Sequence, residues 1–248
     1  MPKRYHCIQV RNGCLTEIDD EIVSEDQFRI FYNDHPVTDM IATNDQLKEL
    51  GVGFVVSEGL TKQVDTVKID HDRILVYSDV GCKVIPDQRE YFPSGGTGIP
   101  QEPAKVISSL TITPDEIGEV TRAIDNDIWH RTGAVQCAVL FSDANCVVTS
   151  SDVGMHNAVD KVIGHALLNG INLSRCVIGC TGRQSAAIVK KIANAGIPII
   201  VSWTAATDKG IATAKTAGIT LVCFSRDNRF TIYSHPERVQ GIGQHQCK

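Results

Sequence analysis

The chain has 248 residues, 42% of them hydrophobic, so it is long enough for one large or two modest domains with a proper core. A formal net charge of −5 and the lack of a basic run argue against a nucleic-acid coat protein. We expect a cytoplasmic protein, because the sequence shows neither a signal-type apolar run nor an apolar stretch of membrane-spanning length.

The nine cysteines fit reduced thiols, since their number is odd and no secretory signal accompanies them. Cys176 and Cys180 lie on one predicted strand, which separates them by roughly 13 Å, too far to bind one ion. We interpret most cysteines as small buried hydrophobic residues and expect no metal site.

The amino-terminal part is predicted to form antiparallel strands. Apolar and polar residues alternate over residues 5–37, with turn sequences at 12–13 and 33–34. Two further strands are predicted at residues 67–69 and 74–77.

A helix is predicted between these strands, with Asn44 as its N-cap. Gly51 and Gly53 lie inside it at a cost of about 1 kcal/mol each relative to Ala, which indicates that another backbone passes close. Its apolar stripe consists of Leu47, Leu50, Phe54 and Val55.

Residues 86–103 show no periodicity and predict a long loop around the Ser-Gly-Gly-Thr-Gly sequence at 94–98. A flexible interdomain linker and a functional loop both fit that composition. The next helix begins after Thr113, which forms a capping box with Glu116 and is followed by Pro114. Its buried face is predicted to consist of Ile117, Val120, Ile124 and Ile128.

A strand at residues 138–141 leads by a hairpin into three strand, turn and helix units over residues 146–218, a pattern that predicts a parallel sheet. The turns after such strands meet at one edge of the sheet, where helix N–H groups favour anions. A phosphate-bearing ligand is one interpretation; the alternative is that the hydroxyls are helix N-caps. The polar turn residues are Thr149, Ser150, Thr181, Arg183, Ser202 and Thr204.

The helical patterns in this block also predict which side chains avoid the core. Lys190 and Lys191 are expected to point outward. Residues near the preceding helix start are expected to lie away from the deepest core; they are His156, Asn157, Asp160 and Lys161. The chain then continues with strands at 220–224 and 230–233, joined by a basic turn at 225–229.

Several long motifs resemble the FdhD family, the formate dehydrogenase accessory sulfurtransferases. They are D-V-G-x-H-N-A-V-D-K-V-I-G at 152–164, T-G-R-x-S at 181–185, A-G-I-P at 195–198 and G-I-T-L-V-x-F at 218–224. The glycine-containing helix at 47–59 is also similar to the family's. The resemblance covers residues 28–239, with the motifs in the family's order.

The resemblance implies an α/β protein with two domains. Residues 1–104 would form a small α+β domain with the 94–98 loop at its end, and residues 105–248 a cytidine-deaminase-like, three-layer, cofactor-binding domain. Family members are cytoplasmic and commonly homodimeric. They accept persulfide sulfur from a cysteine desulfurase and pass it to the molybdenum bis-molybdopterin guanine dinucleotide cofactor before its insertion into formate dehydrogenase.

Cofactor-binding residues carry over by position. Arg183 would face a phosphate, and Arg226 and Arg229 suit the same role because guanidinium groups fork onto phosphate oxygens. The whole implied set is Asp152, His156, Asn157, Thr181, Gly182, Arg183, Phe224, Ser225, Arg226, Asp227, Asn228 and Arg229.

The sulfur-carrying Cys-Gly-x-Cys-Gly loop of the family corresponds here to residues 94–98, where Ser94 and Thr97 replace both thiols. A hydroxyl cannot hold a persulfide, because the exchange needs a thiolate. Substitute carriers to consider are Cys82, Cys137 and Cys180. The pocket sequence departs further: Ser151, Met155, Gln136 and Ala187 stand where the family has Glu, Arg, His and Glu.

Three hypotheses follow. The first is sulfur transfer by a substitute cysteine, with Cys82 nearest to the loop. The second is a binding protein that holds a guanine-containing molybdopterin or another nucleotide without sulfur chemistry. The third is a divergent member with a different small ligand. Zinc-dependent deamination is rejected, because the chain lacks the His-x-Glu and Cys-x-x-Cys set.

Overall fold

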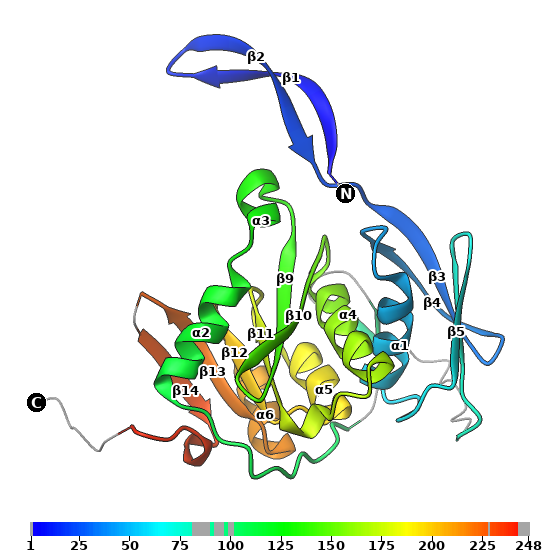
Figure 1. Ribbon diagram of the computed structural model, residues 1–248, viewed down its shortest axis with the longest axis vertical. Helices are drawn as coiled ribbons and strands as arrows, with labels where there is room; N and C mark the ends of the chain where they lie inside the picture. Colours follow the sequence, from blue (N-terminus) through cyan, green and yellow to red (C-terminus); the bar gives the residue numbers. More distant parts are fainter. Residues whose placement is uncertain (1, 81–89, 92–96, 99–101, 228, 243–248) are drawn as a thin grey trace, which may run out of the picture.

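A six-stranded and a four-stranded sheet make up the body of the chain in the computed structural model (Figure 1). The structure describes residues 2–80, 90–91, 97–98, 102–227 and 229–242. Each sheet has its own buried apolar cluster. The mixed α/β class predicted from the sequence is confirmed, whereas the domain boundary at 104/105 and the cytidine-deaminase-like label stay predictions.

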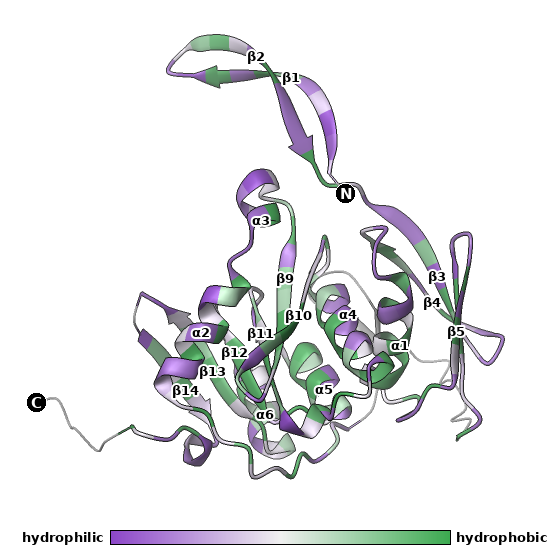
Figure 2. Cartoon of the chain, viewed as in Figure 1, coloured by the Kyte–Doolittle hydropathy of each residue, from purple (hydrophilic) through white to green (hydrophobic). Residues whose placement is uncertain are grey.

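The large sheet is covered by helices on both faces. Its strands, in spatial order, are β10 (Asn145–Asp152), β9 (Gln136–Ser142), β11 (Cys176–Cys180), β12 (Ile199–Ser202), β13 (Thr220–Arg226) and β14 (Arg229–Ser234). On one face lie α4 (Met155–Leu168), α5 (Ala186–Ala195) and α6 (Asp208–Ala217), and on the other α2 (Pro114–Ile124). Figure 2 shows the apolar residues concentrated on these strands and on the helix faces that cover them.

The strands of the three predicted strand, turn and helix units run in one direction, as predicted, but two antiparallel strands make the sheet mixed. β10, β11, β12 and β13 run the same way, but β9 lies antiparallel between β10 and β11, and β14 is antiparallel to β13. The cause is local: Asp143 and Ala144 adopt positive φ and close a two-residue hairpin, which forces β9 and β10 to be antiparallel. The carboxyl ends of the four co-directional strands still meet at one edge.

The small sheet follows the order β4 (His35–Ala42), β3 (Asp26–Tyr32), β6 (Arg73–Tyr77), β5 (Thr66–Asp70). Helix α1 (Leu47–Ser57) packs on it and completes its core. The other described elements are β1 (Lys3–Arg11), β2 (Cys14–Ile22), β7 (Glu90–Tyr91), β8 (Thr97–Gly98), α3 (Asp127–Thr132) and the 3₁₀ turns Leu173–Arg175 and Pro236–Arg238. β1 and β2 form a hairpin that projects from the body (Figure 1).

Two helix boundaries differ from the sequence predictions. α1 begins at Leu47 after Gln46, which is left-handed and makes no side-chain cap, so Asn44 is not the N-cap. α2 starts at the predicted capping box but ends at Ile124, because Asp125 is extended and Asn126 caps α3. Ile128 therefore lies on α3 and is only half-buried.

The two glycines of α1 were expected to mark a close backbone approach, and this is confirmed at Gly53. A Cβ atom there would lie 1.7 Å from the carbonyl oxygen of Asp160 in α4. Across the same contact, a Cβ on Gly164 would lie 1.9 Å from the carbonyl oxygen of Glu49. Gly51 instead makes room for the side chain of Ile74. The small unit, which is the four-stranded sheet with α1, is thus joined to the large unit, which is the six-stranded sheet with its helices, by α1 and α4, whose backbones nearly touch.

Candidate functional site

A pocket of about 900 Å³ lies where the carboxyl ends of β10, β11 and β12 face the small sheet. Its size suits a nucleotide-like ligand. One wall consists of residues from the turns that follow the three strands, and the other comes from β3 and β4. The lining residues are Gln27, Thr38, Asp39, Met40, Ile41, Phe54, Trp129, Gln136, Val153, Gly154, Met155, His156, Asn157, Asp160, Thr181, Gly182, Arg183, Ser185, Ile188, Lys191, Trp203, Thr204 and Thr207.

Hydrogen bonds hold the turns of this pocket against one another. Thr204 Oγ1 donates to the Thr181 carbonyl at 3.1 Å, and Ser202 Oγ donates to the Gly182 carbonyl at 3.0 Å. Thr181 Oγ1 also lies 2.9 Å from Gln136 Oε1. The hydroxyls of Thr181, Ser202 and Thr204 therefore fix the turns rather than cap helices.

None of the hydroxyls named from the sequence stands at the N-cap of α4, α5 or α6. Thr207 Oγ1 accepts from the Gly210 amide at 3.0 Å and caps α6. Ser185 stands at the N-cap of α5 but makes no capping bond and lines the pocket. Arg183 is exposed beside it. The start of α5 therefore offers an arginine, a hydroxyl and helix N–H groups to an anion, as expected from the sequence.

The base of the pocket contains a buried cluster of charged groups that the sequence analysis placed outside the core. Lys191 is 2% exposed, and its Nζ lies 2.9 Å from Asp160 Oδ2, 2.8 Å from Glu58 Oε1 and 3.0 Å from Ser57 Oγ. The prediction that Lys190 and Lys191 point outward was wrong: both side chains are buried, and Lys191 contacts Ser57 at the end of α1. Asp160 and Lys191 both line the pocket.

Burial and charge pairing together set the ionisation of this cluster. Burial raises the pKa of Asp160 to about 6, although Lys191 and Ser57 favour its charged form. Burial alone would lower the pKa of Lys191, but the carboxylates of Asp160 and Glu58 raise it above its ordinary value. Burial and the nearby ammonium of Lys191 lower the pKa of His156 to about 3, so the imidazole is neutral near neutral pH. Asp160 is thus protonated more readily than an ordinary aspartate.

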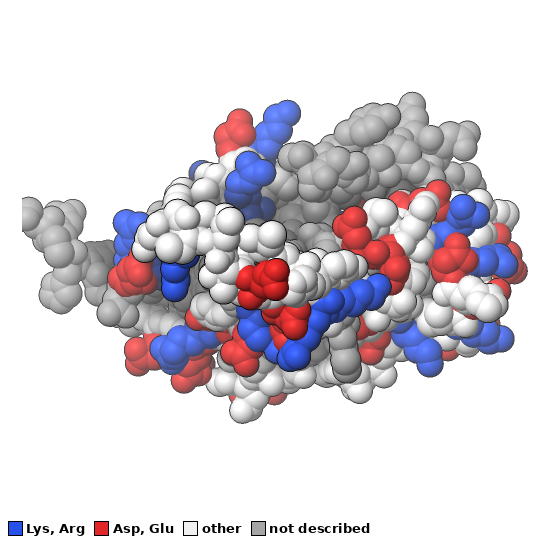
Figure 3. Space-filling model, turned by 90° about the horizontal axis from the view of Figure 1, so that it is seen from above, with Lys and Arg blue, Asp and Glu red and all other residues white. Residues whose placement is uncertain are grey.

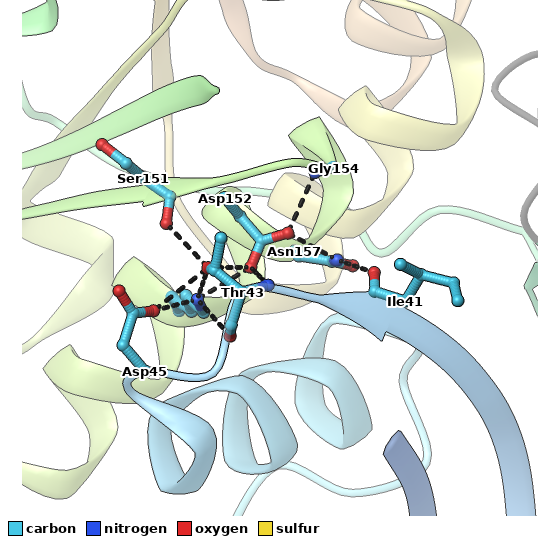
Figure 4. Close-up of polar contacts among 8 residues, drawn as sticks. Ile41, Thr43, Asp45, Ser151, Asp152, Gly154 and Asn157 are labelled. Atoms are coloured by element: carbon cyan, nitrogen blue, oxygen red, sulfur yellow. Dashed lines mark hydrogen bonds and ion pairs between the residues drawn. The ribbon is translucent and has the colours of Figure 1, made fainter. Parts of the chain in front are cut away.

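A second buried cluster lies behind the pocket wall, around Asp152 (Figure 4). One oxygen of Asp152 accepts from the Thr43 amide at 3.1 Å and from Thr43 Oγ1 at 2.8 Å, and pairs with Lys161 at 2.7 Å. The other accepts from Asn157 Nδ2 at 2.8 Å and from the Gly154 amide at 2.9 Å. Asp152 is not among the lining residues, so the structure gives it a role in joining the two units.

Burial of this cluster also corrects the sequence analysis. Asn157, Asp160 and Lys161 are at most 8% exposed, because α1 packs along α4, and the end of β4 accepts a hydrogen bond from Asn157. Asn157 donates to the Ile41 carbonyl at 2.8 Å and lines the pocket. Lys161 also pairs with Asp45.

Residues 224–229, expected to bind the cofactor, are not among those that line this pocket in the described chain. Phe224 has a φ of +52° and donates its amide to the Thr204 carbonyl at 3.0 Å, so it supports a pocket turn from behind. Ser225 Oγ bonds Thr121 Oγ1 at 2.5 Å. Arg226, Asp227 and Arg229 are exposed, and Asn228 lies outside the described residues.

The expected site residues thus divide by position. Those that line the pocket are His156, Asn157, Thr181, Gly182 and Arg183. Sequence reasoning missed the wall from β3 and β4, for which the sequence carries no local signal. It also missed that Trp129 and Trp203 both line the pocket, although a chain with only two tryptophans offers a signal in their rarity.

Neither candidate sulfur carrier within the described residues is accessible. Cys137 and Cys180 do not open to the pocket: both side chains are fully buried, and burial raises the pKa of Cys137 to about 11 and that of Cys180 to about 12. Such thiols are poor nucleophiles. Cys82 and Ser94 lie outside the described residues, and of Thr97 only the backbone, in β8, is described.

Within the described ranges, no group of three or more His, Cys, Asp or Glu side chains is arranged to hold a metal ion. None of the helices there combines the length and hydropathy needed to cross a bilayer. On the face seen in Figure 3, acidic and basic side chains are interspersed rather than gathered by sign.

Comparison with known proteins decides the family. The model of the FdhD/NarQ family matches residues 23–240. The chain belongs to the FdhD/NarQ family. The match includes both buried clusters and every pocket turn, whereas the β1–β2 hairpin lies outside it.

Individual members of the FdhD/NarQ family support this assignment. The chain is 32% identical to "Protein FdhD" of Methanocaldococcus jannaschii over 88% of this chain and 90% of the relative. It is 28% identical to "Sulfur carrier protein FdhD" of Bacillus subtilis over 92% and 94%, respectively. The crystal structure of a putative formate dehydrogenase accessory protein from Desulfotalea psychrophila superimposes with a TM-score of 0.81, 29% identity and coverage of 96% of this chain and 99% of that one.

Proposed function

We propose that this chain is a formate dehydrogenase accessory protein that binds an anionic, guanine-bearing molybdenum cofactor in the pocket. The observation that carries the proposal is the start of α5, where Arg183 and Ser185 line the pocket, which Lys191 further along the same helix also lines. The names of its FdhD relatives support the accessory role. Formate dehydrogenase is the proposed client, and a homodimer is the proposed state of the chain.

The residues present fit phosphate groups of such a cofactor. Arg183 supplies positive charge and the helix start supplies N–H donors, whereas the charge of Lys191 is balanced by Asp160 and Glu58. Asp160 lies among them, but its raised pKa allows it to accept a proton as negative charge enters. Bound molybdopterin would supply redox chemistry for the client enzyme, whereas the residues of this chain would hold and orient it.

Binding of guanosine diphosphate, measured by calorimetry, tests the proposal. We expect binding by the unaltered protein and a loss of about 1.5–3 kcal/mol in Arg183→Ala, the usual worth of a hydrogen bond to a charged group. Arg175→Gln is the matched control, because Arg175 is exposed and precedes β11, at the opposite end of that strand. Failure of the unaltered protein to bind would contradict the proposed ligand.

Sulfur transfer is the second candidate function, favoured by the relatives named sulfur carrier proteins. It requires a thiolate other than Cys137 or Cys180, with a cysteine desulfurase as the proposed donor. Mass spectrometry after incubation with a cysteine desulfurase and cysteine would detect one added sulfur that cyanide removes. A persulfide on one peptide would identify the carrier. Its absence, while a relative with both loop cysteines is loaded, would leave only the binding role.

A further inference from the structure

Both tryptophans of this chain line the same pocket. Trp203 lies in the turn that follows β12, and Trp129 lies in α3. Tryptophan is the side chain with the largest flat π surface, and aromatic side chains of this kind serve as stacking platforms for nucleobases. Two in one pocket therefore point to a ligand with a flat ring.

Trp203 is held in one orientation. Its Nε1 donates to the carbonyl oxygen of Thr121 in α2 at 3.0 Å, and its backbone amide donates to the Cys180 carbonyl at 3.2 Å. The half-buried indole packs against the apolar cluster between α2 and the large sheet. Because its polar atom is satisfied and the core supports the ring, Trp203 is a rigid surface that needs little ordering when a ligand binds.

Trp129 is placed differently, with 41% of its surface exposed. Its amide donates to Asn126 Oδ1 at 2.9 Å, and Asn126 Nδ2 donates to Ser151 Oγ of β10 at 2.9 Å. These bonds fix α3 to the strand that leads into the pocket. Core packing does not account for an indole that remains this exposed on a pocket wall.

We propose that a planar heteroaromatic ring of the pocket's ligand stacks on Trp203, with Trp129 bounding the outer side of that ring site. The inference rests on the proposed function, whose cofactor carries guanine. A purely aliphatic ligand is disfavoured, because Asp39, Asp160, Arg183 and Lys191 line the same pocket. The phosphates would lie toward Arg183, since Thr204 joins the Trp203 turn to the Thr181 turn.

Tryptophan fluorescence tests this placement directly. In Trp129→Phe, the only remaining indole is Trp203, so its emission reports on one position. Guanosine diphosphate is the probe, and inorganic pyrophosphate is the control because it carries the phosphates without a ring. We expect guanosine diphosphate to quench Trp203 emission and pyrophosphate to bind without quenching.

Substitution of the platform gives a second readout. Trp203→Leu is expected to weaken guanosine diphosphate binding about tenfold while pyrophosphate affinity changes less than about twofold, given the usual strength of base stacking. Trp203→Phe keeps a ring and is expected to stay within about threefold of the unaltered protein. If the Leu variant does not fold, the fluorescence of Trp129→Phe decides.

The outcomes separate this inference from the proposed function. Calorimetric binding of guanosine diphosphate with no change in Trp203 emission would overturn ring stacking and leave the proposed function standing. Equal weakening of pyrophosphate and guanosine diphosphate in Trp203→Leu would also overturn it, because the effect would then lie in the phosphate site. Failure of both probes to bind the unaltered protein would overturn the two proposals together.

Discussion

Lys161 and Lys191 are two buried lysines that form similar ion pairs but differ in their access to the pocket. Each lies on a helix of the large unit and pairs with a carboxylate of the small unit, Asp45 for Lys161 and Glu58 for Lys191. Each also pairs with a carboxylate of its own unit. Lys161 is sealed behind the pocket wall, whereas Lys191 lines the pocket.

The difference lies in what surrounds the two ammonium groups. Around Lys161, Asp152 is saturated by hydrogen bonds from Thr43, Asn157 and Gly154, so nothing remains for a ligand to exchange. Around Lys191, Asp160 has a pKa raised to about 6 and faces the cavity. A buried ion pair can therefore be purely structural or be ready to respond to a ligand, and its access to a cavity distinguishes the two.

Removal of the central carboxylate of the sealed cluster should have the largest effect. Asp152→Ala leaves Lys161 without its buried partner. It also leaves the hydrogen-bond donors of Thr43 and Asn157 without their acceptor. We expect the free energy of unfolding to fall by about 5 kcal/mol, the upper range for breaking a buried ion pair. Urea denaturation measures it. A loss below about 1 kcal/mol would mean that the cluster does not join the two units.

Exchange of each lysine for methionine tests the comparison itself. Lys161→Met and Lys191→Met should each lose about 3–4 kcal/mol of unfolding free energy, because each leaves at least one buried carboxylate without its cation. Only Lys191→Met should also weaken guanosine diphosphate binding, by about tenfold, since only Lys191 lines the pocket. Calorimetry on the folded variants measures the difference. Equal affinities of the two variants for guanosine diphosphate would show that access to the pocket does not distinguish the two lysines.

The buried imidazole of His156 predicts a smaller, pH-dependent effect. Its pKa falls from 6.5 to about 3 on folding, so the unfolded chain binds more protons between these values, and stability falls as the pH is lowered. His156→Gln should remove about 2 kcal/mol of that loss between about pH 6.5 and about pH 4.5. Asp160 works in the opposite direction, because its folded pKa is raised, and it remains in both proteins. Urea denaturation of both proteins at the two pH values measures this effect. An equal loss of unfolding free energy in His156→Gln and in the unaltered protein would contradict the prediction.

The exposed pair of Arg175 and Asp143 should show the smallest effect. Its atoms lie 2.8 Å apart, as close as those of the buried pairs, but both side chains are about two-thirds exposed. Solvent screens such a pair, so Arg175→Gln should leave the midpoint of urea denaturation unchanged within error. A clear shift would show that burial is not what separates the strong pairs from the weak one.

Much of the fold was predictable from local signals. The capping box at Thr113, the hairpin turn at residues 143–144 and the glycine after α6 each act on their own neighbours, and all are observed. The glycine pair of α1 predicted a close backbone approach, which Gly53 confirms. The end of α2 was missed, because a polar Asp-Asn break between two short helices is a weak signal against a continuing apolar stripe.

The candidate site was predicted only where its residues follow the strands of the large sheet. The turn at Thr181–Arg183 was placed at the strand edge because the strands around it share a direction. The opposing wall comes from Gln27 and Thr38 to Ile41, more than a hundred residues earlier, and no local pattern links it to that turn. Asp152, expected in the pocket, is turned to Thr43 and Lys161 instead.

By itself, the sequence determined the mixed α/β class, most element positions, the family and the turns that form one edge of the pocket. These depend on hydrophobic periodicity, capping and turn chemistry, which act between residues close in the chain. Tertiary structure alone decided that Lys161 and Lys191 are buried, that Asp152 supports the pocket from behind and that both tryptophans meet at one cavity. A charged residue on a helix face is buried or exposed according to what packs against that face, and here that was α1, a helix distant in sequence.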